Sequence, residues 1–229
     1  MIDQNDLEYY ITLLRDKKPF SFTRWGDGEW LCTYGASGNN CDGHEYFSDM
    51  SDSLRKVFDQ PDRYFLATWP LQEEPMMFNL PGELRQFIAS RRWADARIWE
   101  EAAMAGKLGS LVNQLEDMNF IIVSEPSKRE LDINYTDFID IPSKNCFLDK
   151  ERIKQEMRKM CEKYDMPVFG LSASMASNVI VDELFEELGK KCWMIDFGSI
   201  WEPFLKNPVH SRSYHSKYKS TSIKEQIHE

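Results

Sequence analysis

Residues 23–30 carry the pattern in this chain that is best suited to chemistry. Two carboxylates, those of Asp27 and Glu29, stand one residue apart and alternate with Gly26 and Gly28. Mg²⁺ and Mn²⁺ take oxygen ligands, commonly one or two carboxylates together with the phosphates of a substrate. Glycines let the backbone approach such a ligand closely. The segment therefore predicts a metal site. The alternative is a plain turn with an acidic residue in the first turn of a helix, where negative charge is favoured on structural grounds.

Two other residues near this segment have side chains that suit a site. Arg24 stands just before the acidic pair, where it would neutralise a pyrophosphate or hold Asp27 in place. His44, in the segment 39–46, would with Asp42 supply a base or contact an acceptor. The alternative for His44 is the capping of an Asp-Gly turn, and the segment lacks the spacing of a zinc site.

Hydrophobic periodicity predicts the elements that must position these residues. Helices are predicted over 4–17, 48–60, 149–164 and 175–188, from Trp30 onward, and, with breaks, over 82–117. Strands are predicted over 20–23, 64–67, 120–123, 138–141, 168–171 and 192–195. Strands that alternate with helices are typical of an α/β domain with a mostly parallel sheet. In such sheets ligands bind at the carboxyl ends of the strands. Small, polar or acidic residues follow several of these strands: Ser124, Glu125, Ser172, Ser174, Asp196, Gly198 and Ser199.

Composition narrows the class of protein. The 229 residues suit one domain of ordinary size, and 28 Lys and Arg against 38 Asp and Glu give a net charge of −10. The general surface is therefore not expected to wrap a nucleic-acid backbone. No apolar run is long enough for a membrane-spanning helix, so no membrane insertion is expected. The five cysteines form no C-x-x-C pair and no signal peptide is visible, which favours reduced thiols in a cytoplasmic protein.

Motifs of other enzyme classes are missing from the sequence. It contains neither Gly-x-x-x-x-Gly-Lys-Ser/Thr nor Gly-x-Gly-x-x-Gly. The run 170–174 only partly imitates the Gly-x-Ser-x-Gly of serine hydrolases. These absences leave the acidic segment as the main functional signal.

The run Ser-Phe-Thr-Arg-Trp-Gly-Asp-Gly-Glu at 21–29 resembles the N-terminal signature of the GT-D-fold glycosyltransferases. A second block, 170–178 followed by 193–199, is similar to the small-residue loop and the closing strand end of that family. The resemblance spans about residues 18–205. The family often carries a histidine at the position of Ser199. A phage or viral member of the family would fit a small free-standing chain of this kind.

The resemblance implies a Rossmann-like fold, with a mostly parallel sheet flanked by helices, and an enzyme that uses a sugar nucleotide, most simply one carrying UDP. Asp27 and Glu29 would hold Mn²⁺ or Mg²⁺ against the diphosphate, and the metal would stabilise the leaving nucleotide. The loop 172–178 opens a helix, so its backbone N–H groups would receive the phosphates. The alternative for that loop is an ordinary serine-rich helix cap.

Further site residues follow from the same resemblance. Ser172, Ser174, Asn178 and Gly198 would line the phosphate site. Asp196 would bind the ribose, assist the metal or act as a base, with a buried structural aspartate as the alternative.

Several functional alternatives stay open on the sequence alone. The acceptor is either a glycan or glycoprotein, or a modified base in phage DNA. A non-catalytic nucleotide-sugar-binding module would keep the same fold, and a metal-dependent phosphoryl-transfer or hydrolytic enzyme would use the same acids. The oligomeric state and the stereochemical outcome are not specified by the sequence.

The chain is expected to divide into one α/β domain over 1–205 and a basic C-terminal stretch over 206–229. That stretch contains three of the four histidines, His210, His215 and His228, with interleaved tyrosines. It would form either a solvated tail or an anion-binding flap.

Overall fold

The computed structural model describes residues 6–58, 64–206, 213–218 and 223. The described residues form one seven-stranded sheet in the order β3-β2-β1-β7-β6-β4-β5, and every pair of neighbouring strands is parallel. The strands are β1 (Ser21–Trp25), β2 (Tyr64–Thr68), β3 (Ala94–Asp95), β4 (Phe120–Ser124), β5 (Asp137–Asp140), β6 (Val168–Leu171) and β7 (Trp193–Asp196). The predicted α/β class with a mostly parallel sheet is confirmed.

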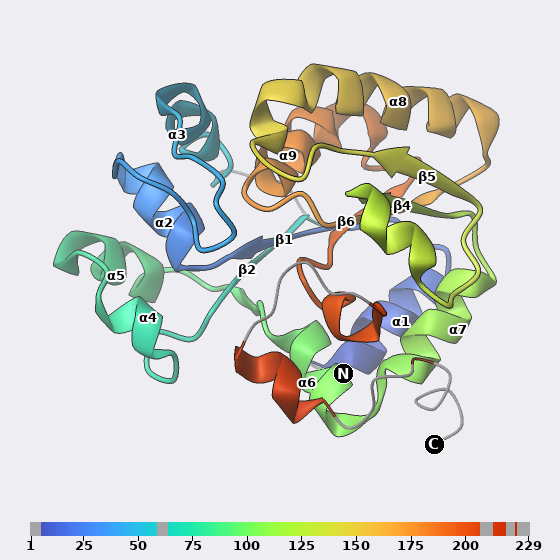
Figure 1. Cartoon of the computed structure of the whole chain (residues 1–229), viewed down its shortest axis with the longest axis horizontal. Helices are drawn as coiled ribbons and strands as arrows, with labels where there is room; N and C mark the ends of the chain where they lie inside the picture. Colours follow the sequence, from blue (N-terminus) through green and yellow to red (C-terminus); the bar gives the residue numbers. More distant parts are fainter. Residues whose placement is uncertain (1–5, 59–63, 207–212, 219–222, 224–229) are drawn as a thin grey trace.

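Helices cover both faces of this sheet. They are α1 (Leu7–Arg15), α2 (Asp27–Tyr34), α3 (Ser48–Leu54), α4 (Pro75–Phe78), α5 (Gly82–Ala89), α6 (Ile98–Ala105), α7 (Leu108–Glu116), α8 (Lys150–Lys163) and α9 (Ala176–Leu188). Short 3₁₀ segments are η1 (Pro126–Glu130), η2 (Cys146–Asp149), η3 (Glu202–Phe204) and η4 (Ser213–Lys217). Figure 1 shows α8 and α9 on one side of the sheet and α1, α6 and α7 on the other. None of the helices in the described residues is long and apolar enough to span a membrane.

Alternating side chains of the central strands fill the two cores. In β4, Ile121 and Val123 pack in the core beneath α8 and α9, whereas Phe120 and Ile122 pack in the core beneath α1, α6 and α7. Successive side chains of a strand point to opposite faces of the sheet. The continuous apolar run at 120–123 therefore belongs to a strand buried on both sides, as its sequence predicted.

The order of the strands creates a natural binding position. The chain builds β1, β2 and β3 toward one edge of the sheet and places the later strands on the other side of β1, with β7 paired directly to it. In open parallel sheets ligands bind in the crevice at such a reversal of strand order, outside the carboxyl ends of the strands. The segment 23–30 leaves β1 at this crevice.

The structure corrects three details of the predicted elements. Helix α2 begins at Asp27 and not at Trp30, because the helix already includes the acidic segment. The predicted helix over 48–60 ends at Leu54. The region 82–117 contains the strand β3, whose two residues are too few to show the alternation that marks a strand.

Part of the predicted C-terminal stretch is described, and it packs on the domain. Tyr218 and Ile223 are buried in the core beneath α1, α6 and α7, and Tyr218 contacts Phe204. His210 and His228 lie outside the described residues.

Candidate active site

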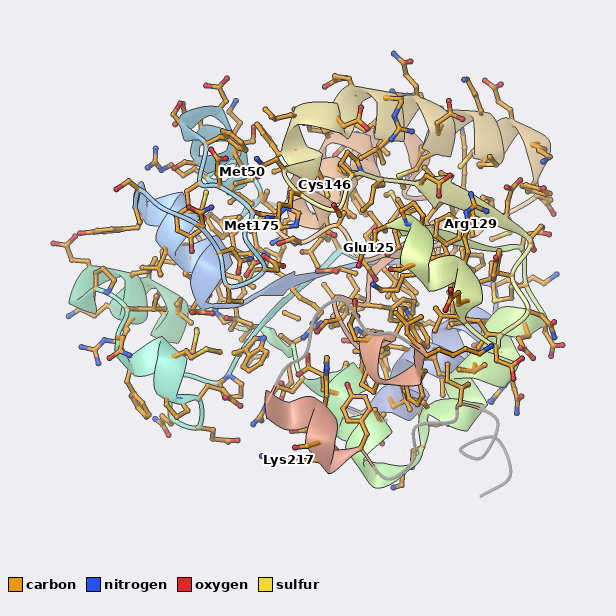
Figure 2. The ribbon with its side chains drawn as sticks, in the orientation of Figure 1. Met50, Glu125, Arg129, Cys146, Met175 and Lys217 are labelled. Carbon is orange, nitrogen blue, oxygen red and sulfur yellow. The ribbon has the colours of Figure 1, made fainter. Side chains whose placement is uncertain are left out.

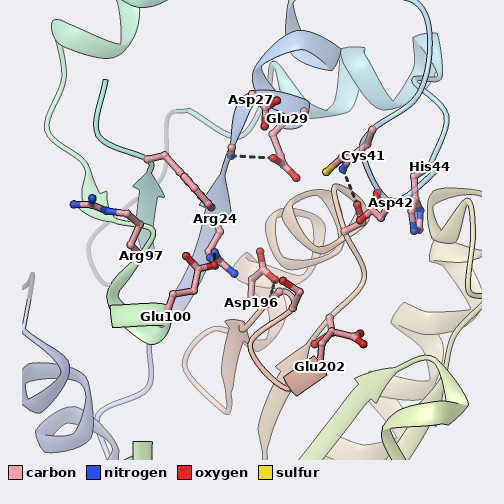
Figure 3. Close-up of a pocket in the computed structure, with 18 of the residues that line it drawn as sticks. Arg24, Asp27, Glu29, Cys41, Asp42, His44, Arg97, Glu100, Asp196 and Glu202 are labelled. Atoms are coloured by element: carbon pink, nitrogen blue, oxygen red, sulfur yellow. Dashed lines mark hydrogen bonds and ion pairs between the residues drawn. The ribbon is translucent and has the colours of Figure 1, made fainter. Parts of the chain in front are cut away.

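A cavity of about 630 Å³ opens at the carboxyl ends of the central strands. The predicted site residues that line it are Arg24, Gly26, Asp27, Gly28, Glu29, His44, Ser172, Ser174, Asp196 and Gly198. Asn178 does not line it, since this residue is fully buried behind the cavity wall. Figure 3 shows the side chains of the cavity, and Figure 2 places Glu125 near the middle of the molecule and Lys217 at the edge.

The N-terminus of α2 presents the acidic pair. Gly26 is the residue before the helix, Asp27 is the first helical residue, and the Glu29 carboxylate accepts a hydrogen bond of 2.9 Å from the Gly26 backbone N–H. This bond fixes Glu29 in place. In Figure 3 its carboxylate faces the space that Asp42 and Asp196 also border. The free N–H groups and dipole of the helix start favour negative charge there, whether from these acids or from a bound anion.

Burial changes the titration of Glu29. Burial, against the opposing effect of backbone hydrogen bonds and with smaller contributions from the carboxylates of Asp196 and Asp42, raises the pKa of Glu29 to about 7. Such a shifted carboxylate in a cavity is typical of a functional site. A cation would relieve the repulsion among these acids.

Asp196 ends β7 and faces the same cavity. Its carboxylate accepts a hydrogen bond of 3.0 Å from the Gly198 backbone N–H. Burial raises the pKa of Asp196 to about 6, although the nearby Arg24 guanidinium lowers it. Gly198 has a φ of +55°, and a Cβ placed there would lie 2.2 Å from Nη1 of Arg24. The close approach and the left-handed backbone together require glycine at this position.

The Arg24 side chain lines the cavity and contacts three parts of the fold. Its guanidinium donates from Nε to the Ala96 carbonyl at 2.9 Å and from Nη1 to the Phe197 carbonyl at 3.1 Å, and it forms an ion pair with Glu100. These partners come from the ends of β3 and β7 and from α6. The Arg24 side chain is therefore held by Glu100 and the two carbonyls and not by Asp27, which is fixed by its place in the first turn of α2.

The loop between β6 and α9 forms another wall. Ser174 has a φ of +51°, and its hydroxyl accepts a hydrogen bond of 3.1 Å from Asn40. The hydroxyl of Ser172 has no hydrogen-bond partner among the described residues. Asn178 donates to the Arg24 carbonyl at 2.9 Å and so connects α9 to β1. The loop thus presents two serines to the cavity, while Asn178 supports them from behind.

His44 reaches the cavity from the segment that follows α2. Its Nδ1 accepts a hydrogen bond of 3.0 Å from the Asn145 backbone N–H, which leaves the proton of the neutral ring on Nε2. The side chain is 8% exposed. The contact links the segment 39–46 to the loop after β5. The ring is thereby held in place, and the described residues contain no group of His, Cys, Asp and Glu with His44 that could hold a metal.

Sequence reasoning missed an ion cluster in the cavity wall. Lys128 lies 2.9 Å from Glu125 and also pairs with Glu202, and all three residues are buried. Glu125 could be identified as a candidate site residue from the sequence, since it directly follows a predicted strand. Lys128 and Glu202 could not, because 74 residues separate them and only the fold brings them together.

The residues present fit a hard divalent cation that shares its ligands with a substrate. Oxygen donors of Asp27 and Glu29 are the type that Mg²⁺ and Mn²⁺ prefer. Within the described ranges, however, no three His, Cys, Asp or Glu side chains are grouped tightly enough to hold a metal by themselves. A cation bound here would complete its coordination with substrate phosphates and water.

Comparisons with known proteins bear on the fold. No family model matches the chain, and no curated protein matches it. One similar solved structure is described as a new glycosyltransferase (DUF1792) from Streptococcus sanguinis, with a TM-score of 0.64 and 19% identity over 87% of this chain and 81% of that chain. Another, described as a domain of unknown function 1792 with a distinct glycosyltransferase fold, has a TM-score of 0.59 and 17% identity over 93% and 86%.

A third, a selenomethionine-substituted structure of the same domain of unknown function, has a TM-score of 0.58 and 17% identity over 83% of this chain and 76% of that chain. Identities this low show the fold alone. The all-parallel sheet, the position of the cavity and these three likenesses lead to one conclusion: the chain has a glycosyltransferase fold of the DUF1792 type.

Proposed function

We propose that the chain is a metal-dependent glycosyltransferase that moves a sugar from a nucleotide-sugar donor, most simply UDP-linked, to a hydroxyl of an acceptor. The observation that carries the proposal is that Asp27 and Glu29, at the start of α2, line a cavity at the reversal of strand order in a glycosyltransferase fold. Asp27 and Glu29 are the residues proposed to hold Mn²⁺ or Mg²⁺.

The charge of the cavity explains why a cation is needed. Nine Asp or Glu residues line it against four Lys or Arg residues. A bare diphosphate would be repelled by this excess of carboxylates. When bound, Mn²⁺ or Mg²⁺ would neutralise the diphosphate and stabilise the charge that develops on the leaving nucleotide.

The chain's own groups would position the two substrates. Backbone N–H groups at the start of α9 and the hydroxyls of Ser172 and Ser174 would receive the donor phosphates. His44 would donate from Nε2 to an oxygen of the substrate. Asp196, with a pKa raised to about 6, is ionised near neutral pH, and it is the carboxylate proposed to accept a proton from the acceptor hydroxyl.

The same excess of acids favours a glycan over DNA as the acceptor. A polyanionic backbone requires an array of Lys and Arg. Of the four cationic residues that line the cavity, Arg24, Arg97 and Lys128 already form ion pairs with carboxylates of this chain. A neutral sugar avoids that repulsion, and carboxylates accept hydrogen bonds from its hydroxyls.

Thermal-shift measurements with a panel of nucleotide sugars, with and without Mn²⁺, test the donor and the metal together. A ligand that binds only the folded state raises its apparent stability, so the donor is identified by the largest shift. Asp27→Asn should abolish the Mn²⁺-dependent affinity for UDP in calorimetry. Asp49→Asn, which changes an exposed acid in the first turn of α3, is the matched control and should bind as the wild type does. Unchanged UDP affinity in Asp27→Asn would refute the metal role.

Product analysis separates this proposal from its alternatives. A glycosyltransferase should release UDP from its donor slowly, and Asp27→Asn should stop that release. A binding module would bind donor and Mn²⁺ without any release. A hydrolytic enzyme would release UDP at full rate with water alone, and added sugars would not accelerate it.

A further inference from the structure

The cavity has an apolar wall directly beside the acidic pair. Trp69 follows β2, and its backbone N–H donates to the Trp25 carbonyl at 3.3 Å. A Cβ placed on Gly26 would lie 3.8 Å from Nε1 of Trp69 and 3.2 Å from Oε2 of Glu29. The indole is therefore adjacent to the carboxylate on which the metal site is proposed to depend.

Two methionines also line the cavity, and together with Trp69 they make up the apolar wall. Met76 of α4 and Met104 of α6 line the same cavity as Trp69, and Met76 is 44% exposed. Ligand pockets are lined mainly by apolar and aromatic side chains, with a few polar groups that orient the ligand. A pyranose ring has an apolar C–H face that stacks on flat aromatic and thioether surfaces.

The polar groups of this wall suit hydroxyls and not phosphates. Arg97 lies among carboxylates, at 3.0 Å from Asp95, 3.5 Å from Glu74 and 3.4 Å from Glu101. Glu74 and Glu101 line the cavity with it. The guanidinium charge is more than neutralised, so the wall offers hydrogen-bond donors and acceptors without net positive charge.

The location of the wall distinguishes acceptor from donor. In Figure 3, Arg97 and Glu100 lie on one side of Glu29, whereas Asp42 and His44 lie on the other side. The serine loop lies on the His44 side, because Ser174 bonds to Asn40, whose backbone N–H donates to the His44 carbonyl. If the donor phosphates bind to the loop that carries Ser172 and Ser174, the apolar wall remains available for the acceptor.

We propose that Trp69, Met76 and Met104 form the acceptor subsite, which binds an uncharged sugar ring against the apolar wall while Glu74 and Arg97 hold its hydroxyls. This proposal rests on the proposed function. In the transfer step the acceptor oxygen forms a bond to the anomeric carbon, the bond from that carbon to the diphosphate oxygen breaks, the nucleoside diphosphate leaves, and the hydroxyl proton passes to a cavity carboxylate.

Variants of the wall test the proposal through acceptor kinetics. Methyl glycosides of glucose, galactose, N-acetylglucosamine and rhamnose are the probes, with the donor identified by thermal shift. Met76→Ala should raise the acceptor KM about fivefold and Trp69→Leu about tenfold or more, and in Met76→Ala the donor KM should stay within about twofold of wild type. Phe78→Ala is the matched control, because Phe78 is 50% exposed on the same helix and does not line the cavity.

Saturation-transfer NMR on the same glycosides gives a readout that does not depend on turnover. Binding to the wild type that is weakened in Met76→Ala and unchanged in Phe78→Ala supports the subsite, even if no donor is found and the proposed function fails. The proposal is overturned if no glycoside binds the wild type, if Trp69→Leu and Met76→Ala leave the acceptor KM unchanged, or if a duplex with hydroxymethylated cytosines is preferred over every glycoside. Circular dichroism of each variant excludes misfolding as the cause of a loss.

Discussion

Replacement of Glu29 by glutamine should change how the stability of the metal-free protein depends on pH. Burial raises the pKa of Glu29 from an ordinary value of 4.5 to about 7 in the folded state. The folded protein therefore binds the proton more tightly than the unfolded chain, and the stability that protonation gives is lost as the pH rises from about 4.5 through 7. The difference between the two pKa values corresponds to about 3 kcal/mol as an upper limit, since Glu29 keeps some contact with solvent.

Glutamine keeps an oxygen for the Gly26 backbone N–H and cannot ionise. Urea unfolding in EDTA should therefore show Glu29→Gln more stable than wild type by about 1–3 kcal/mol near pH 8, with the gap closing near pH 5. Glu83→Gln, at an exposed glutamate in the first turn of α5, should track the wild type. Parallel stability curves for wild type and Glu29→Gln between those pH values would refute the account of a desolvated, repelled carboxylate.

Other perturbations follow from contacts in the site. Gly198→Ala should destabilise the fold by about 2–4 kcal/mol in urea unfolding, because the new methyl group meets Arg24 and the backbone is left-handed. Gly43→Ala is the control, because Gly43 also has a positive φ but has room for a methyl group, and it should cost about 1 kcal/mol. Equal losses of stability in the two variants would disprove the clash with Arg24. Lys128→Met should cost about 3–5 kcal/mol, because it leaves two buried carboxylates without their ammonium, and combining it with Glu202→Gln should recover part of that loss. A double variant no more stable than Lys128→Met would count against this reading of the cluster.

The parts of the fold that were predictable have strong local patterns. The buried run at 120–123 and the amphipathic helix near 150–163 are recognisable because burial on a face repeats along the chain. The strand β3 was not predictable. Its two residues are ordered by pairing with the end of β2, through Ala67 and Thr68, and that pairing depends on residues far away in the sequence.

The candidate site was predictable where its residues are neighbours in the chain, and where they follow a predicted strand, as Ser172 and Asp196 do. Asp27 and Glu29 lie in one turn of helix, so their common location could be read from the segment itself. From the residues next to Arg24, the sequence predicted a pyrophosphate or Asp27 as its partner. The observed partners, Ala96, Glu100 and Phe197, lie 72, 76 and 173 residues away. No periodicity encodes such contacts.

The acidic cavity also explains why this fold tolerates an unfavourable arrangement. Asp42 and Asp196 repel the Glu29 carboxylate, and burial opposes the ionisation of both Glu29 and Asp196. Structural acids are normally paired or exposed, because an unneutralised buried charge lowers stability. Arg24 pairs with Glu100 and lowers the pKa of Asp196, while Lys128 pairs with Glu125 and Glu202, so the ion pairs of these two cations do not include Glu29. If Asp27 and Glu29 hold Mn²⁺ as proposed, the stability gained on adding Mn²⁺ should exceed any gain from a monovalent ion.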